Sequence, residues 1–216
     1  MKARQSLDTD KRPTDLRSDP ARKREQILDA ALRLFAHEPF QAVTMERVAE
    51  RAGVAKGTLY LYFTSKEELY LGILSDGLET MARRYQHAVV PDADVCARLC
   101  GAIDTSFRFY SERRDFLTLL ATEEPRLAEA RSRLIRQWRG RGTAFFTSLI
   151  EEGIASGVFA PVDPGVATLM ILGGIRSVML FHSGRRPVAE LSRDFVKLIL
   201  GGLRAEAGAV RKGAAR

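Results

Sequence analysis

Apolar side chains recur every three or four residues along most of the chain, and no stretch alternates convincingly with the period of two typical of a β-strand. A first helix is predicted after Asp19 and Pro20, because aspartate caps a helix and proline suits its first position. Residues 153–164 are rich in turn-forming types and predict a break. Further helices are predicted over 65–87, 95–111, 116–121, 125–150, 166–182 and 188–203. The pattern therefore predicts an all-α protein.

Residues 44–66 predict two short helices separated by a glycine. Thr44 can cap the first helix, and Gly53 can end it because glycine adopts positive φ without strain. Ser65 and Glu68 then predict a capping box at the start of a longer helix. Two short helices around a tight turn form a helix-turn-helix unit, whose second helix enters the major groove of DNA.

The second short helix carries side chains suited to DNA if Val54 and Leu59 face the core. Lysine can donate to guanine or phosphate, tyrosine and threonine hydroxyls can reach phosphates or base edges, and glycine permits close approach. The candidate DNA-binding residues are Thr44, Lys56, Gly57, Thr58, Tyr60, Tyr62 and Lys66. The alternative interpretation is an ordinary helical hairpin with surface tyrosines.

A dense series of motif positions lies between residues 27 and 74. They are Leu34-Phe35, Thr44, Val48-Ala49, Ala52-Gly53-Val54, the run from Gly57 to Phe63, and the run from Ser65 to Leu69. In these positions the chain resembles the DNA-binding domain of TetR-family (tetracycline-repressor-like) transcriptional regulators. The resemblance implies base-facing positions at Lys56 and Thr58, and phosphate contacts from Thr44, Tyr60, Tyr62 and Lys66. Pro39 replaces the glycine usual after the first helix, so the exit from that helix must differ.

Composition and motifs divide the chain into a tail (1–18), a helix-turn-helix DNA-binding head (19–64), a helical regulatory and dimerisation body (65–206) and a second tail (207–216). The first tail has almost no apolar side chains and is expected to be flexible, either as a solvated segment or as a basic arm that reaches DNA. The net charge of +7 and sequence pI of about 9.7 suit a polyanionic partner, although much of the excess lies in the tails.

The predicted helices 166–182 and 188–203 are too apolar to have one solvated face, and a second subunit would cover them. The candidate dimer-interface residues are Met170, Gly173, Gly174, Ser177, Phe195 and Ile199. The resemblance implies the same pairing, as a four-helix bundle. A dimer would place two recognition helices about 34–36 Å apart, on successive turns of DNA. Because Arg176 and two glycines interrupt the apolar run 166–182, a buried helix is predicted and no membrane span.

Regulators of this family usually hold a small ligand in the body, and aromatic residues are available there. The candidate ligand-binding residues are Phe107, Tyr110, Trp138, Phe145 and Arg176. An ordinary aromatic core is the alternative for the first four. Arg176 within an apolar helix needs a carboxylate, a backbone acceptor or an anionic ligand.

Cys96 and Cys100 lie one helical turn apart, which permits a thiol sensor or half of a metal site, although buried cysteines often act as small hydrophobes. The three histidines have no ligand spacing, so no metal is expected. Two cysteines and the absence of a signal-peptide pattern predict a cytoplasmic protein. No catalytic or phosphate-cradling motif is present, so no enzyme and no cofactor are expected.

The sequence thus predicts a homodimeric, ligand-responsive repressor of a near-palindromic operator. Its expected partners are operator DNA, a second copy of the chain and a small-molecule effector that changes the angle of the fourth helix. Two alternatives remain open. One is a thiol- or metal-sensing repressor that uses Cys96 and Cys100, and the other is a helical enzyme or carrier of small molecules with a vestigial DNA head.

Overall fold

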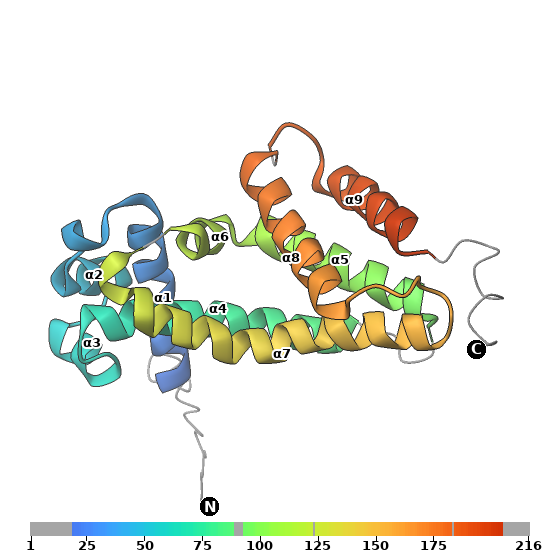
Figure 1. Cartoon of the computed structure of the whole chain (residues 1–216). Coiled ribbons are helices and arrows are strands. Elements are labelled where there is room, and N and C mark those ends of the chain that lie inside the picture. Colours follow the sequence, from blue (N-terminus) through green and yellow to red (C-terminus); the bar gives the residue numbers. More distant parts are fainter. Residues whose placement is uncertain (1–18, 89–92, 123, 183, 205–216) are drawn as a thin grey trace, which may run out of the picture.

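The computed structural model describes residues 19–88, 93–122, 124–182 and 184–204, and over these residues it confirms the all-α fold. The predicted tails, 1–18 and 207–216, lie outside the described residues. The α-helices are α1 (Pro20–His37), α2 (Met45–Ala52), α3 (Lys56–Tyr62), α4 (Lys66–Ala88), α5 (Val95–Glu112), α6 (Arg114–Ala121), α7 (Ala128–Ala155), α8 (Pro164–Phe181) and α9 (Val188–Leu203). Two 3₁₀ helices are η1 (Phe40–Ala42) and η2 (Pro125–Leu127). Helices α1–α3 form a head at one end, and α4 and α7 run lengthwise from it into the body (Figure 1).

The predicted helix ends in the head are confirmed. The Asp19 carboxylate accepts from the backbone N–H of Ala21 at 3.0 Å, and the Thr44 hydroxyl accepts from that of Arg47 at 3.3 Å. Gly53 ends α2 in the left-handed conformation, with φ of 65°. The two caps satisfy N–H groups that the first turn of a helix leaves unpaired. At the end of α2, the N–H groups of Gly53 and Val54 donate to the carbonyls of Glu50 and Ala49.

The exit from α1 differs as Pro39 requires. Glu38 and Pro39 are both extended, with φ of −132° and −57°, and no left-handed residue is used. The Arg47 guanidinium braces this exit by donating to both Glu38 carboxylate oxygens, at 2.6 and 2.8 Å, and to the Ala42 carbonyl at 3.1 Å. This bidentate pair stabilises a path that a glycine would otherwise provide.

Of the two hydrogen bonds in the capping box predicted for α4, one is present and the other has a different donor. The Ser65 hydroxyl accepts from the Glu68 N–H at 3.1 Å, as expected. The Glu68 carboxylate, however, accepts from the N–H and hydroxyl of Thr64, at 2.7 and 2.6 Å, and not from the Ser65 N–H. These hydrogen bonds lower the pKa of Glu68.

The long helix α7 differs from its predicted bounds at both ends. Pro125 begins the 3₁₀ turn η2, and α7 starts at Ala128. At the other end α7 continues to Ala155, so Gly153 is helical and not part of the break. Gly153 is needed there because a Cβ would lie 2.0 Å from Cδ2 of Phe159, which folds back onto the helix.

Helix α4 belongs to both halves of the molecule. Near its start Leu69 and Leu74 are buried in the head, and near its end Tyr85 is buried in the body. All three belong to one continuous apolar cluster that runs through both halves. The head and body therefore share a core through this helix.

Helix α6 makes the second connection between the halves. Its Asp115 carboxylate lies 3.1 Å from Nε2 of His37 at the end of α1. Its buried Phe116 presses on α4 where the helix has Gly77, since a Cβ there would lie 2.0 Å from Cε2 of Phe116. In Figure 1 α6 lies between the head and the body.

The contact between Gly77 and Phe116 predicts the effect of adding a methyl group. Gly77→Ala should lower the free energy of unfolding by about 1–3 kcal/mol, because the buried ring has to move. Urea unfolding followed by circular dichroism measures it. Gly57→Ala is the control, since nothing lies within 4 Å of a Cβ there and alanine favours helix. A Gly77→Ala protein as stable as the wild type would contradict the assigned packing.

Candidate nucleic-acid interface and ligand cavity

Helix α3 is fixed by residues on one side and projects another side to solvent. Leu59 and Phe63 are buried against the head core, whereas Leu61 is 85% exposed and Tyr60 is 40% exposed. Gly57 lies one turn before Leu61, and nothing lies within 4 Å of a Cβ built on it. The outermost ridge of the helix is therefore made by Gly57 and Leu61.

The predicted DNA-binding residues on α3 lie at different depths. Lys56 is exposed, and its ammonium lies 2.5 Å from a Glu46 carboxylate oxygen of α2 and 5.9 Å from the centroid of the Tyr60 ring. The hydrogen bond to Glu46 raises the pKa of Lys56, which keeps the side chain charged. Thr58 and Tyr62 are half-buried and therefore lie beside the exposed ridge.

Lys66 holds the head together. Its ammonium donates to the carbonyls of Phe40 and Val43, both at 2.8 Å, and lies 4.4 Å from the centroid of the Phe40 ring. It thereby ties the first turn of α4 to the carbonyl end of η1. The contact of Lys66 with phosphate stays a prediction, and the contacts seen here give it a structural role that its place in the motif did not reveal.

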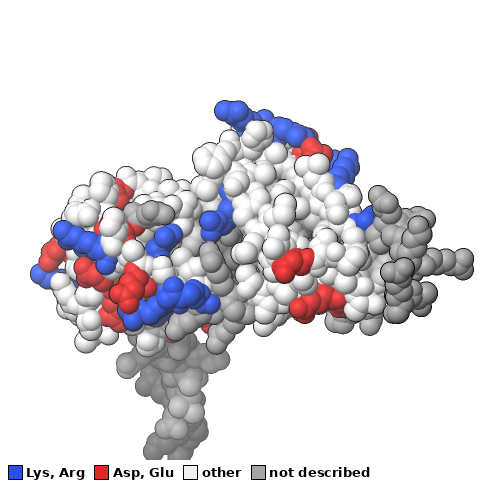
Figure 2. Space-filling view, in the orientation of Figure 1, with Lys and Arg blue, Asp and Glu red and all other residues white. Residues whose placement is uncertain are grey.

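Gln26 is a residue of the head whose structural role the sequence gave no reason to expect. Its side-chain amide donates to the Ala52 carbonyl at 2.7 Å, just before the turn of the helix-turn-helix. This bond fixes α1 to the end of α2 and so sets the orientation of the turn. Figure 2 shows basic and acidic side chains interspersed over the head, which agrees with a local charge near balance.

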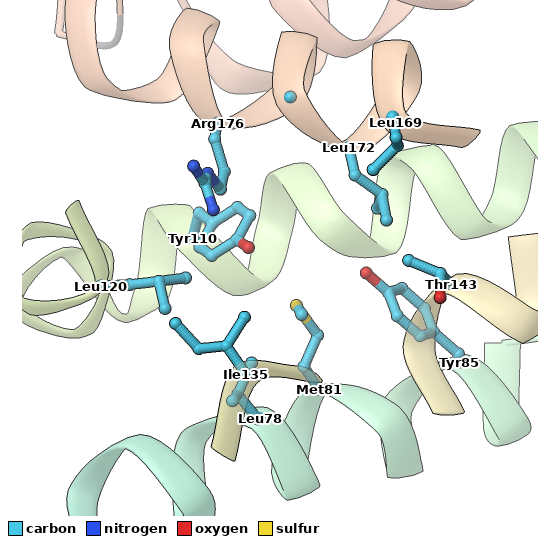
Figure 3. A pocket seen from close by; sticks show the side chains of 11 residues that line it. Leu78, Met81, Tyr85, Tyr110, Leu120, Ile135, Thr143, Leu169, Leu172 and Arg176 are labelled. Carbon is cyan, nitrogen blue, oxygen red and sulfur yellow. The ribbon is translucent and has the colours of Figure 1, made fainter. Parts of the chain in front are cut away.

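The body contains a cavity of about 260 Å³ that is mostly apolar. Its walls come from α4 to α8 and consist of Leu78, Met81, Tyr85, Tyr110, Leu120, Ile135, Thr143, Leu169, Leu172, Gly173 and Arg176 (Figure 3). The volume exceeds the space that a benzene-sized molecule needs. A largely apolar cavity with a few polar groups is typical of a small-molecule site.

Tyr110 and Arg176 lie close together in the wall of this cavity (Figure 3). Burial raises the pKa of Tyr110 to about 12, and the nearby Arg176 opposes part of that rise. The Tyr110 hydroxyl is therefore protonated and can donate a hydrogen bond. Arg176 is exposed and makes no ion pair within the described part of the chain. Together the two side chains offer donors to an incoming group.

Tyr85 is polar but already satisfied on the opposite side of the cavity. Its hydroxyl lies 2.9 Å from the Ser106 hydroxyl, and Ser106 donates to the Ala102 carbonyl at 2.9 Å. Burial raises the pKa of Tyr85, so it too remains neutral. This end of the cavity therefore suits an apolar group better than a charged one.

The predicted ligand-binding residues separate into two groups. Tyr110 and Arg176 line the cavity, whereas Phe107 is buried against Phe195, with ring centroids 5.5 Å apart. Phe145 stacks on the ring of Tyr85 at 5.4 Å and supports the wall from behind. The side chain of Trp138 lies outside the described residues. No residue of α4 was among the predicted ligand-binding residues, although Leu78 and Met81 of this helix line the cavity.

Helices α8 and α9 leave apolar side chains in solvent. Met170, Phe181 and Leu198 are 67%, 76% and 76% exposed, and a groove of about 320 Å³ between the two helices contains Met170 and Ile199. Helix α8 is long and apolar enough to pass for a membrane span by composition. Of the residues predicted to contact a partner subunit, Met170 lies on this exposed side.

The predicted dimer-interface residues do not all share that exposed side. Gly173 lines the cavity, and Gly174 packs against its own chain, since a Cβ there would lie 2.8 Å from Cε2 of Phe195. Ser177 is exposed. Gly174 thus serves packing within the chain, and the contact of these α8 residues with a second subunit remains a prediction.

The two cysteines are free and partly buried on α5. Burial raises the pKa of Cys100, and the neighbouring Cys96 adds to this effect. A raised pKa reduces the thiolate fraction on which sensing depends. Among the described residues there is also no group of three His, Cys, Asp or Glu side chains that could hold a metal.

Family models match both halves of the chain. "Bacterial regulatory proteins, tetR family" covers residues 27–73, and "Tetracyclin repressor-like, C-terminal domain" covers residues 92–203, which is more than half of the chain. The chain belongs to the TetR family. It is a DNA-binding regulator by this membership, and the fold expected of the family, a helix-turn-helix head with a helical body, is confirmed.

Individual members of the TetR family align over most of their length. The HTH-type transcriptional repressor KstR2 of Mycolicibacterium smegmatis is 25% identical over 193 residues, covering 88% of this chain and 94% of the relative. The fatty acid degradation regulator FadR of Bacillus halodurans has a similar structure, with a TM-score of 0.77, 23% identity and coverage of 88% and 100%. FadR of Bacillus subtilis, solved with stearoyl-CoA, has a TM-score of 0.71, 22% identity and coverage of 82% and 98%. The two FadR likenesses bear on the fold alone.

The contacts of Lys66 and Lys56 predict that removing the first side chain lowers stability and removing the second does not. Lys66→Ala should lower the free energy of unfolding by about 1–3 kcal/mol, because the carbonyls of Phe40 and Val43 lose their donor. Lys56→Ala is the matched control and should leave stability nearly unchanged, because its ion pair with Glu46 is exposed. Thermal and urea unfolding measure both. Equal stability of the two variants would contradict the structural role assigned to Lys66.

Proposed function

We propose that this protein is a homodimeric, ligand-responsive repressor that binds a two-fold symmetric operator in the cytoplasm. The observation that carries the proposal is a single helix, α4, which joins the core of a helix-turn-helix head to the wall of a cavity. Lys56 and Tyr60 on α3 are exposed, which supports a contact of both with DNA. The KstR2 relative is named a transcriptional repressor, which supports the direction of regulation.

The dimer rests on the apolar surface of α8 and α9. A second copy of the chain would remove Met170, Phe181 and Leu198 from water and bring the same surface of its partner against them, as a two-fold axis requires. This arrangement also explains an apolar α8 without a membrane. Two heads related by the same axis would then contact successive half-sites of the operator.

The effector proposed for the cavity is an apolar molecule that carries an anionic group. The apolar walls on α4, α6 and α7 would take its body, while Arg176 and the protonated Tyr110 would donate to its anion. The name of one relative supports this class, the Fatty acid metabolism regulator protein of Bacillus subtilis, which is 25% identical over 184 residues. A long acyl chain would need more room than 260 Å³, so the cavity would have to widen towards the surface.

Widening of the cavity would act on DNA binding through α4. Leu78 and Met81 of α4 line the cavity, so an effector that separates α4 from α8 would change the angle of the helix that carries the head. The effector can shift this equilibrium only by binding one arrangement more tightly than the other. By linkage, operator DNA would weaken effector binding by the same factor.

Selection of bound sequences from a random duplex pool tests the operator. At physiological salt the wild-type chain should enrich a two-fold symmetric sequence, and Tyr60→Phe should lower its affinity for that sequence without unfolding the dimer. Analytical ultracentrifugation gives the oligomeric state, and fluorescence anisotropy gives the affinity. Enrichment of no sequence, or binding by a monomer, would overturn the proposal.

The anionic part of the effector is tested with a matched pair of probes, decanoate and decan-1-ol. Decanoate should bind the wild type about tenfold more tightly, because charge-assisted hydrogen bonds add to the shared apolar contacts. Arg176→Gln should remove this preference and leave decan-1-ol binding unchanged. Isothermal titration calorimetry measures all four affinities. Equal binding of both probes to the wild type would refute the role of Arg176.

A further inference from the structure

Leu61 is the most exposed large apolar side chain among the described residues, and it lies in the middle of the recognition surface. It is 85% exposed, whereas Leu59, two positions earlier on the same helix, is fully buried. Isolated apolar side chains are common on protein surfaces and need no explanation by themselves. The place of Leu61 on α3 makes it informative, because that helix is the one expected to enter DNA.

No side chain in the described part of the chain crowds the outward side of α3 next to Leu61. Gly57 lies four residues earlier on the same ridge, and nothing lies within 4 Å of a Cβ built there. The absence of a side chain at Gly57 leaves Leu61 as the most prominent group on the outward side of α3. Lys56 and Tyr60 lie beside this ridge, and the Lys56 ammonium lies 5.9 Å from the centroid of the Tyr60 ring. As the most exposed side chain of α3, Leu61 would face the base edges if α3 lay in the major groove with this ridge inward.

Leucine can neither donate nor accept a hydrogen bond, so it has no favourable contact with phosphate or with the polar edges of bases. The apolar group that the major groove does present is the C5-methyl of thymine. Against a polar base edge, Leu61 would remove water from a donor or acceptor and return no hydrogen bond. Against thymine, it would bury its own apolar surface and that of the methyl group.

We propose that Leu61 is a specificity-determining residue that recognises thymine methyl groups at one symmetric pair of operator positions. This inference rests on the proposed function, because it requires α3 to lie in the major groove. It assigns a contact with thymine, a base for which the polar residues of the motif provide no apolar partner. Lys56 and Tyr60 would supply affinity for the backbone or guanine, and Leu61 would select for thymine.

The test removes only the methyl group. In the operator enriched by the wild-type chain, thymidine is replaced by deoxyuridine at one symmetric pair of positions at a time, and affinity is measured by fluorescence anisotropy. At one pair of positions, replacing thymidine in both half-sites should lower the affinity of the wild type about fifteenfold. Replacing it in one half-site only should lower the affinity about fourfold, the effect expected of one buried methyl group. Leu61→Ala should bind the thymidine and deoxyuridine duplexes equally at that pair.

Tyr60→Phe is the control, since a lost backbone contact should weaken both duplexes by the same factor and preserve the preference for thymidine. Circular dichroism unfolding checks that Leu61→Ala, a change at an exposed position, retains the wild-type stability. An operator in which no thymidine is sensitive, or a preference that survives in Leu61→Ala, would overturn the inference and leave the proposed function intact. Enrichment of no operator at all would overturn both.

Discussion

Burial of one face of α4 in two places is the constraint on which the rest of the structure depends. Leu69 and Leu74 are buried in the head and Tyr85 in the body, and each such side chain contributes about 2 kcal/mol relative to an exposed one. The helix cannot rotate or tilt at one end without disturbing packing at the other, because protein interiors are densely packed. The head therefore takes its position from whatever fixes α4 inside the body, and the cavity beside Leu78 and Met81 is well placed to do so.

The junction between head and body is less completely packed than α4. A hollow of about 340 Å³ lies there, with Phe35 and Tyr70 on the head side and Glu124 on the body side. The Tyr70 hydroxyl is buried without a hydrogen-bond partner among the described residues, and burial raises its pKa. Unpaired polar groups and empty space lower the cost of separating the two surfaces. The α4 core is thus the rigid part of the connection, and the junction around Tyr70 is the part that can adjust.

The sequence predicted features that depend on neighbouring residues. The caps at Asp19 and Thr44 and the left-handed Gly53 follow from local chemistry, and the all-α class follows from periodicity. Features that depend on distant residues were missed. Lys66 binds carbonyls more than twenty positions away, and the cavity combines side chains from α4 to α8. Leu61 was not predicted, because the candidate residues on α3 were chosen for polar side chains or small size, and only the orientation of α3 shows that it points outward.

The contact between α1 and α6 has a consequence for building hybrid regulators. A fusion made at residue 65, the natural boundary in the sequence, would give the head a new body and with it a foreign α6. Its α1 would then lack the Asp115 partner of His37. Leu69 and Leu74 of α4, which are buried in the head, would be replaced by the residues of the foreign body as well. A hybrid that keeps these contacts would have to take α1–α4 and α6 from the same protein. A fusion at residue 65 separates helices that pack against one another.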